Sequence, residues 1–225
     1  MAFRPLHLVW ILDCSGSMRF EGRIQALNTA IFEALPLMRD VAERNPHARL
    51  LVRAVAFSTG ARWIDPEPKP VHEYTWEDIT AGGSTDMGAA LSLVAEALTV
   101  PPMPERALPP VLVLVSDGQP TDDYEAGLAQ LMATSWGTRA IRVAIAIGRD
   151  ARQDVLQDFI GNDSDRRPLA AGSPDDLAIM IRWSSTIVVG QASQPRVADG
   201  TMPNPLLKPP PPSDQLLVWS EDASL

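Results

Sequence analysis

Three short, nearly continuous apolar runs limit the folds that this chain can adopt. They span residues 6–12, 111–116 and 141–147, and strands that are buried on both faces of a parallel sheet have this pattern. Apolar residues recur every three or four positions over 24–38, which is typical of a helix with one buried face. Because strands and helices alternate along the chain, the pattern predicts an α/β fold. We expect an open, doubly wound, mostly parallel central sheet of Rossmann-like type, with helices on both faces.

Weaker patterns complete the expected order of elements. Residues 48–57 are expected to form a second strand, and a hairpin through 58–60 leads into a short third strand at 61–64, which becomes one antiparallel edge strand. The proline-rich segment 65–80 is expected to be an irregular loop, and Pro36 should kink the first helix or end its regular part. Two further helices are expected at 87–98 and 124–134. A third is expected from Asp150, as its N-cap, to about residue 160, and a fourth begins after Ser173 as its N-cap. A last strand is expected at 167–171.

The composition changes near residue 189, which divides the chain into a domain at 1–188 and a C-terminal tail at 189–225. The tail is rich in proline, glycine and polar residues and cannot build a core of its own. Four prolines at 209–212 favour an extended spacer, and the apolar cluster "LLVW" then precedes the acidic end "SEDASL". We expect this end to dock as an extended peptide, either on a partner or on the chain's own domain.

The charge of the chain excludes several classes of partner. A formal net charge of −9 and a pI of about 4.8 argue against nucleic acid and against an anionic membrane surface. No apolar run approaches the ~20 residues that a membrane span needs, and the N-terminal stretch lacks the small-residue cleavage site of a signal peptide. Cys14 is the only cysteine, so a disulfide within the chain is impossible. This favours a reducing compartment, and we expect a bacterial cytoplasm.

The stretch "DCSGSM" follows the first strand and carries three hard oxygen donors, Asp13, Ser15 and Ser17. A nucleophile elbow is disfavoured, because neither serine has a glycine two residues to each side and no histidine is expected at the carboxyl end of a strand. A phosphate-binding loop needs a Gly-x4-Gly-Lys-Ser/Thr run, which is absent. A cysteine-phosphatase loop is disfavoured because Arg19 comes one residue too early. A metal-ion site is the chemistry that remains.

Two further strand ends supply matching donors. Thr85 lies in the turn "GGSTDMG" before a helix, and Asp117 follows the strand at 111–116. In an open α/β sheet, ligands bind outside the carboxyl ends of the strands, where the strand order reverses. All these side chains offer hard oxygen, which suits Mg²⁺, Mn²⁺ or Ca²⁺ rather than zinc. The alternative is that the two serines cap a helix and Asp117 begins a turn, while Asp122 and Asp123 are expected to cap the next helix.

These motifs resemble those of a known family. "DCSGSM" matches the DxSxS signature of von Willebrand factor A-type (VWA) domains, whose metal-ion-dependent adhesion site (MIDAS) also uses a threonine and a later aspartate. The resemblance covers about residues 4–188, and "SDGQPTDD" is similar to the bacterial tellurium-resistance-associated Y-type proteins within that family. It implies that Mg²⁺, with Mn²⁺ or Ca²⁺ as alternatives, binds the following set: Asp13, Ser15, Ser17, Thr85 and Asp117.

The resemblance also implies a non-enzymatic function. In such sites the ion keeps one position for an outside ligand, so we expect a protein partner that offers an Asp or Glu carboxylate. The chain would then be an adaptor in a bacterial stress or signalling system, with Ser/Thr kinases and PP2C-type phosphatases as candidate partners. The alternative is a metal-dependent, phosphatase-like hydrolase with Asp13 as nucleophile. Against it, Ser15 occupies the position where haloacid-dehalogenase-like enzymes have a second carboxylate, and Lys69 and Lys208 are the only lysines, both in proline-rich loops.

Overall fold

A computed structural model of the chain describes residues 4–45, 48–101, 103–117, 119–148, 150–161 and 166–192. Its strands are β1 (Arg4–Asp13), β2 (Ala48–Ser58), β3 (Gly60–Trp63), β4 (Lys69–Pro70), β5 (Val111–Ser116), β6 (Ile141–Ile147) and β7 (Leu169–Ala171). Its helices are η1 (Gly16–Gly22), α1 (Arg23–Glu43), α2 (Met87–Ala97), α3 (Tyr124–Ala133), α4 (Ser135–Arg139), α5 (Gln153–Ile160), α6 (Pro174–Trp183), η2 (Ser184–Val188) and α7 (Val189–Ala192). Almost all of the expected C-terminal tail, with its docking end, lies outside the described residues.

One sheet contains all of these strands; six of them follow the order β3-β2-β1-β5-β6-β7, and β4 pairs with β2 outside this order. The pairs from β2 to β7 are parallel, whereas β3 pairs antiparallel with β2 at the edge, as the sequence predicts. From β1 the chain first moves outward to β2 and later returns to β5 on the other side of β1. The strand order therefore reverses between β1 and β5, and Leu12 lies opposite Val115 there. The carboxyl ends of these two strands are side by side at the switch point, where α/β sheets bind ligands.

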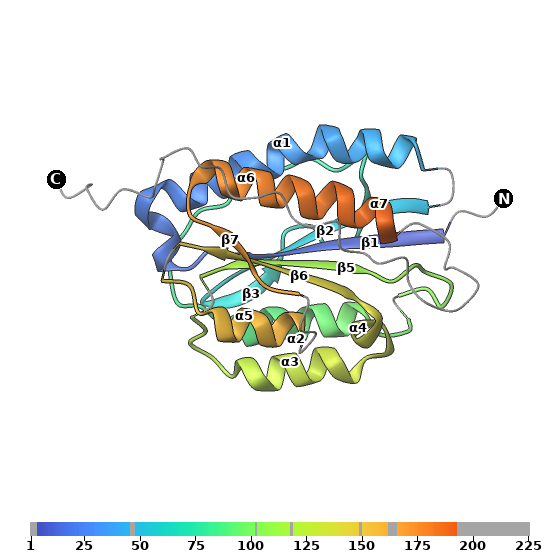
Figure 1. Cartoon of the computed structure of the whole chain (residues 1–225). Coiled ribbons are helices and arrows are strands. Elements are labelled where there is room, and N and C mark those ends of the chain that lie inside the picture. The colour runs from blue at the N-terminus through green and yellow to red at the C-terminus, as the bar shows by residue number, and fades with distance from the viewer. Residues whose placement is uncertain are drawn as a thin grey trace.

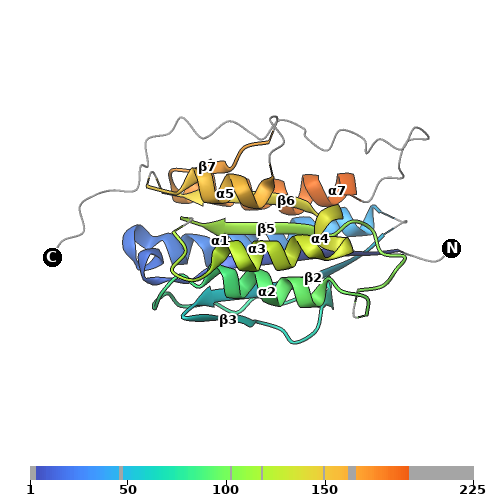
Figure 2. The ribbon, with the colours of Figure 1, turned by 90° about the horizontal axis from the view of Figure 1, so that it is seen from below.

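Helices cover both faces of the sheet. Figure 1 shows α1, α6 and α7 on one face and α2, α3 and α5 on the other, and Figure 2 views the second group from below. Side chains of β1 alternate between the two layers: Leu8, Trp10 and Leu12 belong to one buried cluster, and Val9 and Ile11 to the other. The apolar runs are thus strands buried on both faces, and the doubly wound α/β prediction is confirmed.

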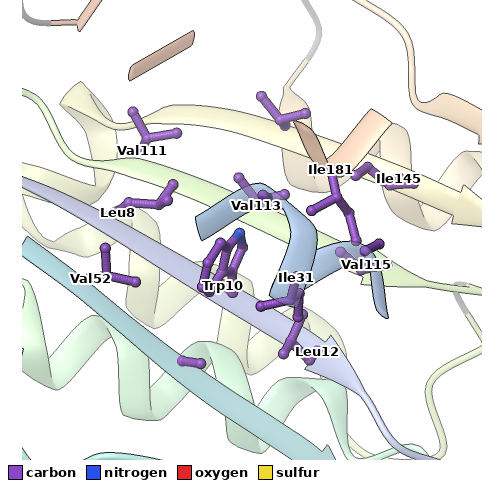
Figure 3. Packing of buried hydrophobic residues seen from close by; sticks show 14 of the residues in the cluster. Leu8, Trp10, Leu12, Ile31, Val52, Val111, Val113, Val115, Ile145 and Ile181 are labelled. Carbon is purple, nitrogen blue, oxygen red and sulfur yellow. The ribbon is translucent and has the colours of Figure 1, made fainter. Parts of the chain in front are cut away.

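Trp10 lies in the buried cluster between the sheet and helices α1 and α6 (Figure 3). Its side chain is fully buried, and its Nε1 donates a hydrogen bond to Ser185 Oγ at 3.2 Å. Its ring meets Tyr74 and Trp76 edge-on, with centroids 6.0 and 6.4 Å away. These contacts hold η2 and the long loop before α2 against β1, three residues before the strand ends at Asp13.

The sequence predictions differ from the structure at several element boundaries. The first helix continues from Pro36 to Glu43, because Leu35 and Met38 stay buried in the core that α1 shares with α6, and this packing offsets the lost backbone bond. The loop at 65–80 contains β4, which extends the antiparallel edge of β2 by two residues. Asp150 does not cap α5: the N-cap is Arg152, and Asp150 forms a salt bridge with Arg23.

The last long helix begins where the sequence predicts. Ser173 is the N-cap of α6 and its hydroxyl accepts a hydrogen bond from the Asp176 amide, while Pro174 occupies the first turn. Among the described residues, no helix is both long enough and apolar enough to cross a membrane.

His7 makes the stability of the fold depend on pH. It lies in β1, and within the described part of the chain its Nε2 has no hydrogen-bond partner. Burial, assisted by the nearby charge of Arg53, lowers the pKa of His7 from 6.5 to about 4. The folded state therefore keeps His7 neutral at pH values where the unfolded chain binds a proton, so stability is lost as the pH falls from about 6.5 towards 4.

We predict that His7→Gln flattens this dependence. Between pH 7 and pH 5 the free energy of unfolding of the wild type should fall by about 2 kcal/mol more than that of His7→Gln, measured by urea denaturation. His72→Gln is the control, because the His72 side chain is 68% exposed, and it should follow the wild type. Parallel curves for the wild type and His7→Gln would contradict the assignment.

Candidate functional site

Asp13 is held at the carboxyl end of β1 with both carboxylate oxygens engaged. Its side chain is fully buried. Oδ1 accepts a hydrogen bond from the Ser15 amide at 2.8 Å, and Oδ2 accepts one from Ser116 Oγ at 2.6 Å. Because Ser116 ends the neighbouring strand β5, the register of the sheet itself places this donor beside the carboxylate.

Ser15 and Ser17 bring two hydroxyls to the same loop. The chain turns directly from β1 into η1, with Ser15 at its N-cap position and Ser17 inside it. The tight turn brings Ser15 Oγ and Ser17 Oγ to 2.9 Å from each other, while Ser15 is buried and Ser17 half-buried. The Ser15 hydroxyl forms no capping hydrogen bond to the η1 backbone, so the alternative role of a simple helix cap is not what this side chain performs.

A second loop, residues 80–86, packs against the first through backbone hydrogen bonds. The Gly82 amide donates to the Cys14 carbonyl at 2.7 Å, and the Gly16 amide donates to the Gly83 carbonyl at 3.0 Å. Gly83 has a φ of +84°, and a Cβ there would lie 2.6 Å from Thr59 Oγ1, so only glycine fits this close approach. The glycine-rich turn of the sequence therefore serves to seat this loop on the "DCSGSM" loop.

Thr85 is buried in this second loop, and its backbone is anchored to a third. Its amide donates to Thr121 Oγ1, and its carbonyl accepts from the Thr121 amide, both at 2.9 Å. Its own hydroxyl forms no hydrogen bond with any residue that the structure describes. The backbone of Thr85 is thus fixed while its side-chain oxygen is left available.

Asp117 comes from the third loop, directly after β5, and is 2% exposed. Its Oδ1 accepts a hydrogen bond from the Gln119 amide at 3.3 Å, and its carbonyl accepts one from the Arg152 amide at 2.7 Å. Its charge acts on the Asp13 carboxylate, as expected for neighbours at the ends of adjacent strands. The structure thus brings the loops that carry Asp13, Ser15, Ser17, Thr85 and Asp117 to one edge of the sheet.

The electrostatics of this edge are unusual for two buried acids. Burial raises the pKa of Asp13 from 3.8 to about 6. Hydrogen bonds from Ser116 and Ser15 oppose that rise, and the nearby Asp117 adds to it. Neither aspartate forms a salt bridge with a described residue. The described residues also contain no cluster of three or more His, Cys, Asp or Glu side chains that could hold a metal, so any ion here depends on the hydroxyls.

Sequence analysis does not identify two polar residues that support these loops, Ser116 and Asp86. Ser116 looks like the end of an apolar strand, and only the register shows that it faces Asp13. Asp86 accepts hydrogen bonds from the Gly60 amide at 2.7 Å and from the Ser84 and Thr121 hydroxyls. These contacts tie the β2–β3 hairpin to the second loop.

The expectation for the two aspartates at 122 and 123 holds for only one of them. Asp123 caps the next helix, α3, by accepting from the Ala126 amide. Asp122 instead caps the preceding helix, α2, by accepting from the Gly88 and Ala89 amides at 2.9 and 2.8 Å. The reason is the close packing of α2 on α3, which brings the third loop over the N-terminus of α2.

Solved structures of several other proteins share this fold. One is the ArnB paralog VWA2 from Sulfolobus acidocaldarius, with a TM-score of 0.57, 16% identity, and coverage of 80% of this chain and 45% of that one. Another is the pilus adhesin SpaC from Lactobacillus rhamnosus GG, with a TM-score of 0.64, 14% identity, and coverage of 84% and 30%. A third is proximal thread matrix protein 1 from the mussel byssus, with a zinc-occupied MIDAS motif. It has a TM-score of 0.59, 15% identity, and coverage of 85% and 48%.

Because the sequence identities are only 14–16%, these similarities support a shared fold and nothing more specific. The chain spans less than half the length of each of these proteins. No curated protein sequence matches the chain. The model of the von Willebrand factor type A domain family matches residues 7–178, a range that begins within β1 and ends within α6. The chain therefore belongs to the von Willebrand factor type A domain family.

Proposed function

We propose that this chain is a metal-dependent protein-interaction module. One divalent cation, Mg²⁺ with Mn²⁺ or Ca²⁺ as alternatives, binds Asp13, Ser15 and Ser17 from the first loop, with Thr85 and Asp117 bound directly or through water. An Asp or Glu carboxylate of a partner protein then completes the coordination. The ion supplies a positive, electrophilic position beside two acids and three hydroxyls.

The observation that carries this proposal is a pair of buried carboxylates that form no salt bridge with a described cationic side chain. Asp13 and Asp117 are both almost fully buried at adjacent strand ends, and no described cationic side chain pairs with either. A buried charge is costly unless it is neutralised by a proton, an opposite charge or a metal ion. A divalent cation relieves both acids at once, and their oxygens are the ligands that Mg²⁺ prefers.

The spacing of the two serine hydroxyls also fits an ion. Neighbouring oxygens in an octahedron with bonds of about 2.1 Å lie about 3.0 Å apart. Ser15 Oγ and Ser17 Oγ form a hydrogen bond of 2.9 Å, and this separation also matches one edge of such an octahedron. The proposed set offers at most five side chains, and an octahedral ion takes six ligands, so at least one position is left for water or for a partner.

A binding role fits Asp13 better than a nucleophilic one. The phosphatase-like alternative requires an Asp13 oxygen that can reach a phosphorus atom. In the structure both oxygens accept hydrogen bonds from within the chain, and the side chain is fully buried. A carboxylate in this position can contact an ion that lies against the loop, but it is screened from a substrate.

The cellular part of the proposal rests on the motif resemblance. The sequence "SDGQPTDD" is similar to tellurium-resistance-associated Y-type proteins, which supports an adaptor role in a bacterial stress or kinase and phosphatase signalling system. The partner would then be a Ser/Thr kinase or a PP2C-type phosphatase. The single cysteine supports a cytoplasmic location.

The first prediction of this proposal concerns the ion. In calorimetric titrations with Mg²⁺ and Mn²⁺, Asp13→Asn should abolish binding, because it removes a charged ligand. Thr85→Ala should weaken binding by only about tenfold, since water can replace a neutral hydroxyl. Ser84→Ala is the matched control, because the Ser84 hydroxyl bonds Thr59 and Asp86, and it should bind like the wild type. Equal affinity in the wild type and Asp13→Asn would exclude the site.

The second prediction concerns docking. A blocked peptide Gln-Gly-Asp-Gly-Gln carries one carboxylate, and its Asp→Asn counterpart carries none. In amide NMR titrations of the full chain, the Asp peptide should shift signals of the loops at 13–17 and 82–86 with Mg²⁺ present and not with EDTA. The Asn peptide should leave them unchanged under both conditions. Binding that persists in EDTA, or no binding of the Asp peptide with Mg²⁺, would refute docking through the ion.

A further inference from the structure

A pocket of about 360 Å³ lies beside the candidate metal site, between the β2–β3 hairpin and residues 80–82. Its size is at the lower end of the range for small-molecule sites, about 300–1,000 Å³, so it suits one or two side chains of a peptide. The lining residues that matter for its chemistry are Cys14, Ser58, Thr59, Arg62, Thr80 and Gly82. Because Cys14 lies between Asp13 and Ser15, the pocket and the proposed ion site share one loop as a common wall.

The walls of this pocket are fixed by hydrogen bonds. The Gly82 amide bonds the Cys14 carbonyl, which attaches one wall to the "DCSGSM" loop. On the other side, Asp86 accepts from the Gly60 amide, and Thr59 Oγ1 accepts from the Ser84 amide at 3.2 Å. A ligand that enters therefore meets a largely preformed pocket and does not have to order these loops.

Arg62 is the only charged residue among the described residues that line the pocket. It is exposed on β3 and forms no hydrogen bond or salt bridge with any other described residue. Neighbouring arginines are engaged: Arg53 lies over the Trp63 ring, and Arg19 donates to the Ala81 carbonyl.

Arg62 is a cationic group on a chain whose net charge is negative. With a net charge of −9, the chain as a whole repels acidic partners. At this edge, Arg62 places a guanidinium that pairs with no other described residue in a preformed pocket beside the proposed cation site. Arginine binds carboxylates through two parallel N–H donors, which gives both attraction and orientation.

We infer that this pocket is a second subsite for the same partner and that it binds an acidic side chain. The partner segment is then an acidic peptide with two carboxylates, one for the ion and one for Arg62, separated by a short spacer. The inference rests on the proposed function, since the first carboxylate docks through the ion. It adds the feature that selects the partner: isolated acids bind the ion, whereas paired acids bind the ion and the pocket together.

The test compares two blocked peptides that differ only in flanking charge, Glu-Gly-Asp-Gly-Glu and Gln-Gly-Asp-Gly-Gln. With Mg²⁺ present, the full chain should bind the first about two- to fivefold more tightly, the range that one partly exposed ion pair contributes. In Arg62→Gln this ratio should fall to about one, while the affinity for the second peptide stays unchanged. Arg49→Gln is the control: it removes the same charge from an exposed position at the opposite end of β2 and should keep the wild-type ratio.

The outcomes separate this inference from the proposed function. If both peptides bind with Mg²⁺ and their ratio is the same in the wild type and Arg62→Gln, the subsite is refuted and docking through the ion stands. If the ratio falls equally in Arg49→Gln, the preference reflects the general charge of the chain, and the subsite is again refuted. If neither peptide shows Mg²⁺-dependent binding, the proposed function fails, and this inference fails with it.

Discussion

The buried carboxylate of Asp13 is the constraint on which the geometry of the functional edge depends. It lies at the end of the central strand β1, where burial, with a further contribution from the charge of Asp117, raises its pKa to about 6. The donors that reach it, the Ser15 amide and the Ser116 hydroxyl, are neutral. A buried charge in such surroundings is costly, and a proton or a cation relieves this cost. The surrounding loops bring hydroxyl oxygens to it, and this is the donor set that fits a hard divalent ion.

The loops around Asp13 form one connected structure. Hydrogen bonds join the Cys14 and Gly16 backbone to residues 82 and 83, and Thr121 joins the third loop to Thr85. Asp86 then ties the second loop to the β2–β3 hairpin. The same bonds that seat the proposed ion ligands therefore also fix the walls of the pocket with Arg62. A partner that docks at this edge would meet two sites in a fixed relation, which favours specificity over adaptability.

The sequence predicts the sheet well because its strands are strong local signals: β5 and β6 begin and end where their apolar runs do. The loops that carry the predicted ligands also meet at one edge, since parallel strands carry their loops to a common side. What sequence patterns miss is decided by tertiary contacts. Ser116 becomes a partner of Asp13 only through strand register, and α1 continues through Pro36 only because its buried face packs on α6. Asp122 caps α2 rather than α3 for the same kind of reason.

The most direct test of the account is the position of a bound ion. Crystals grown with Mn²⁺ should give one anomalous difference peak at this edge, about 2.2 Å from the hydroxyl oxygens of Ser15 and Ser17. The account predicts that at least one position around this ion is filled by water or by a carboxylate of a neighbouring molecule. The absence of a peak at this edge would contradict the metal site. A peak whose every position is filled by this chain's own side chains would contradict docking and leave the ion a structural role.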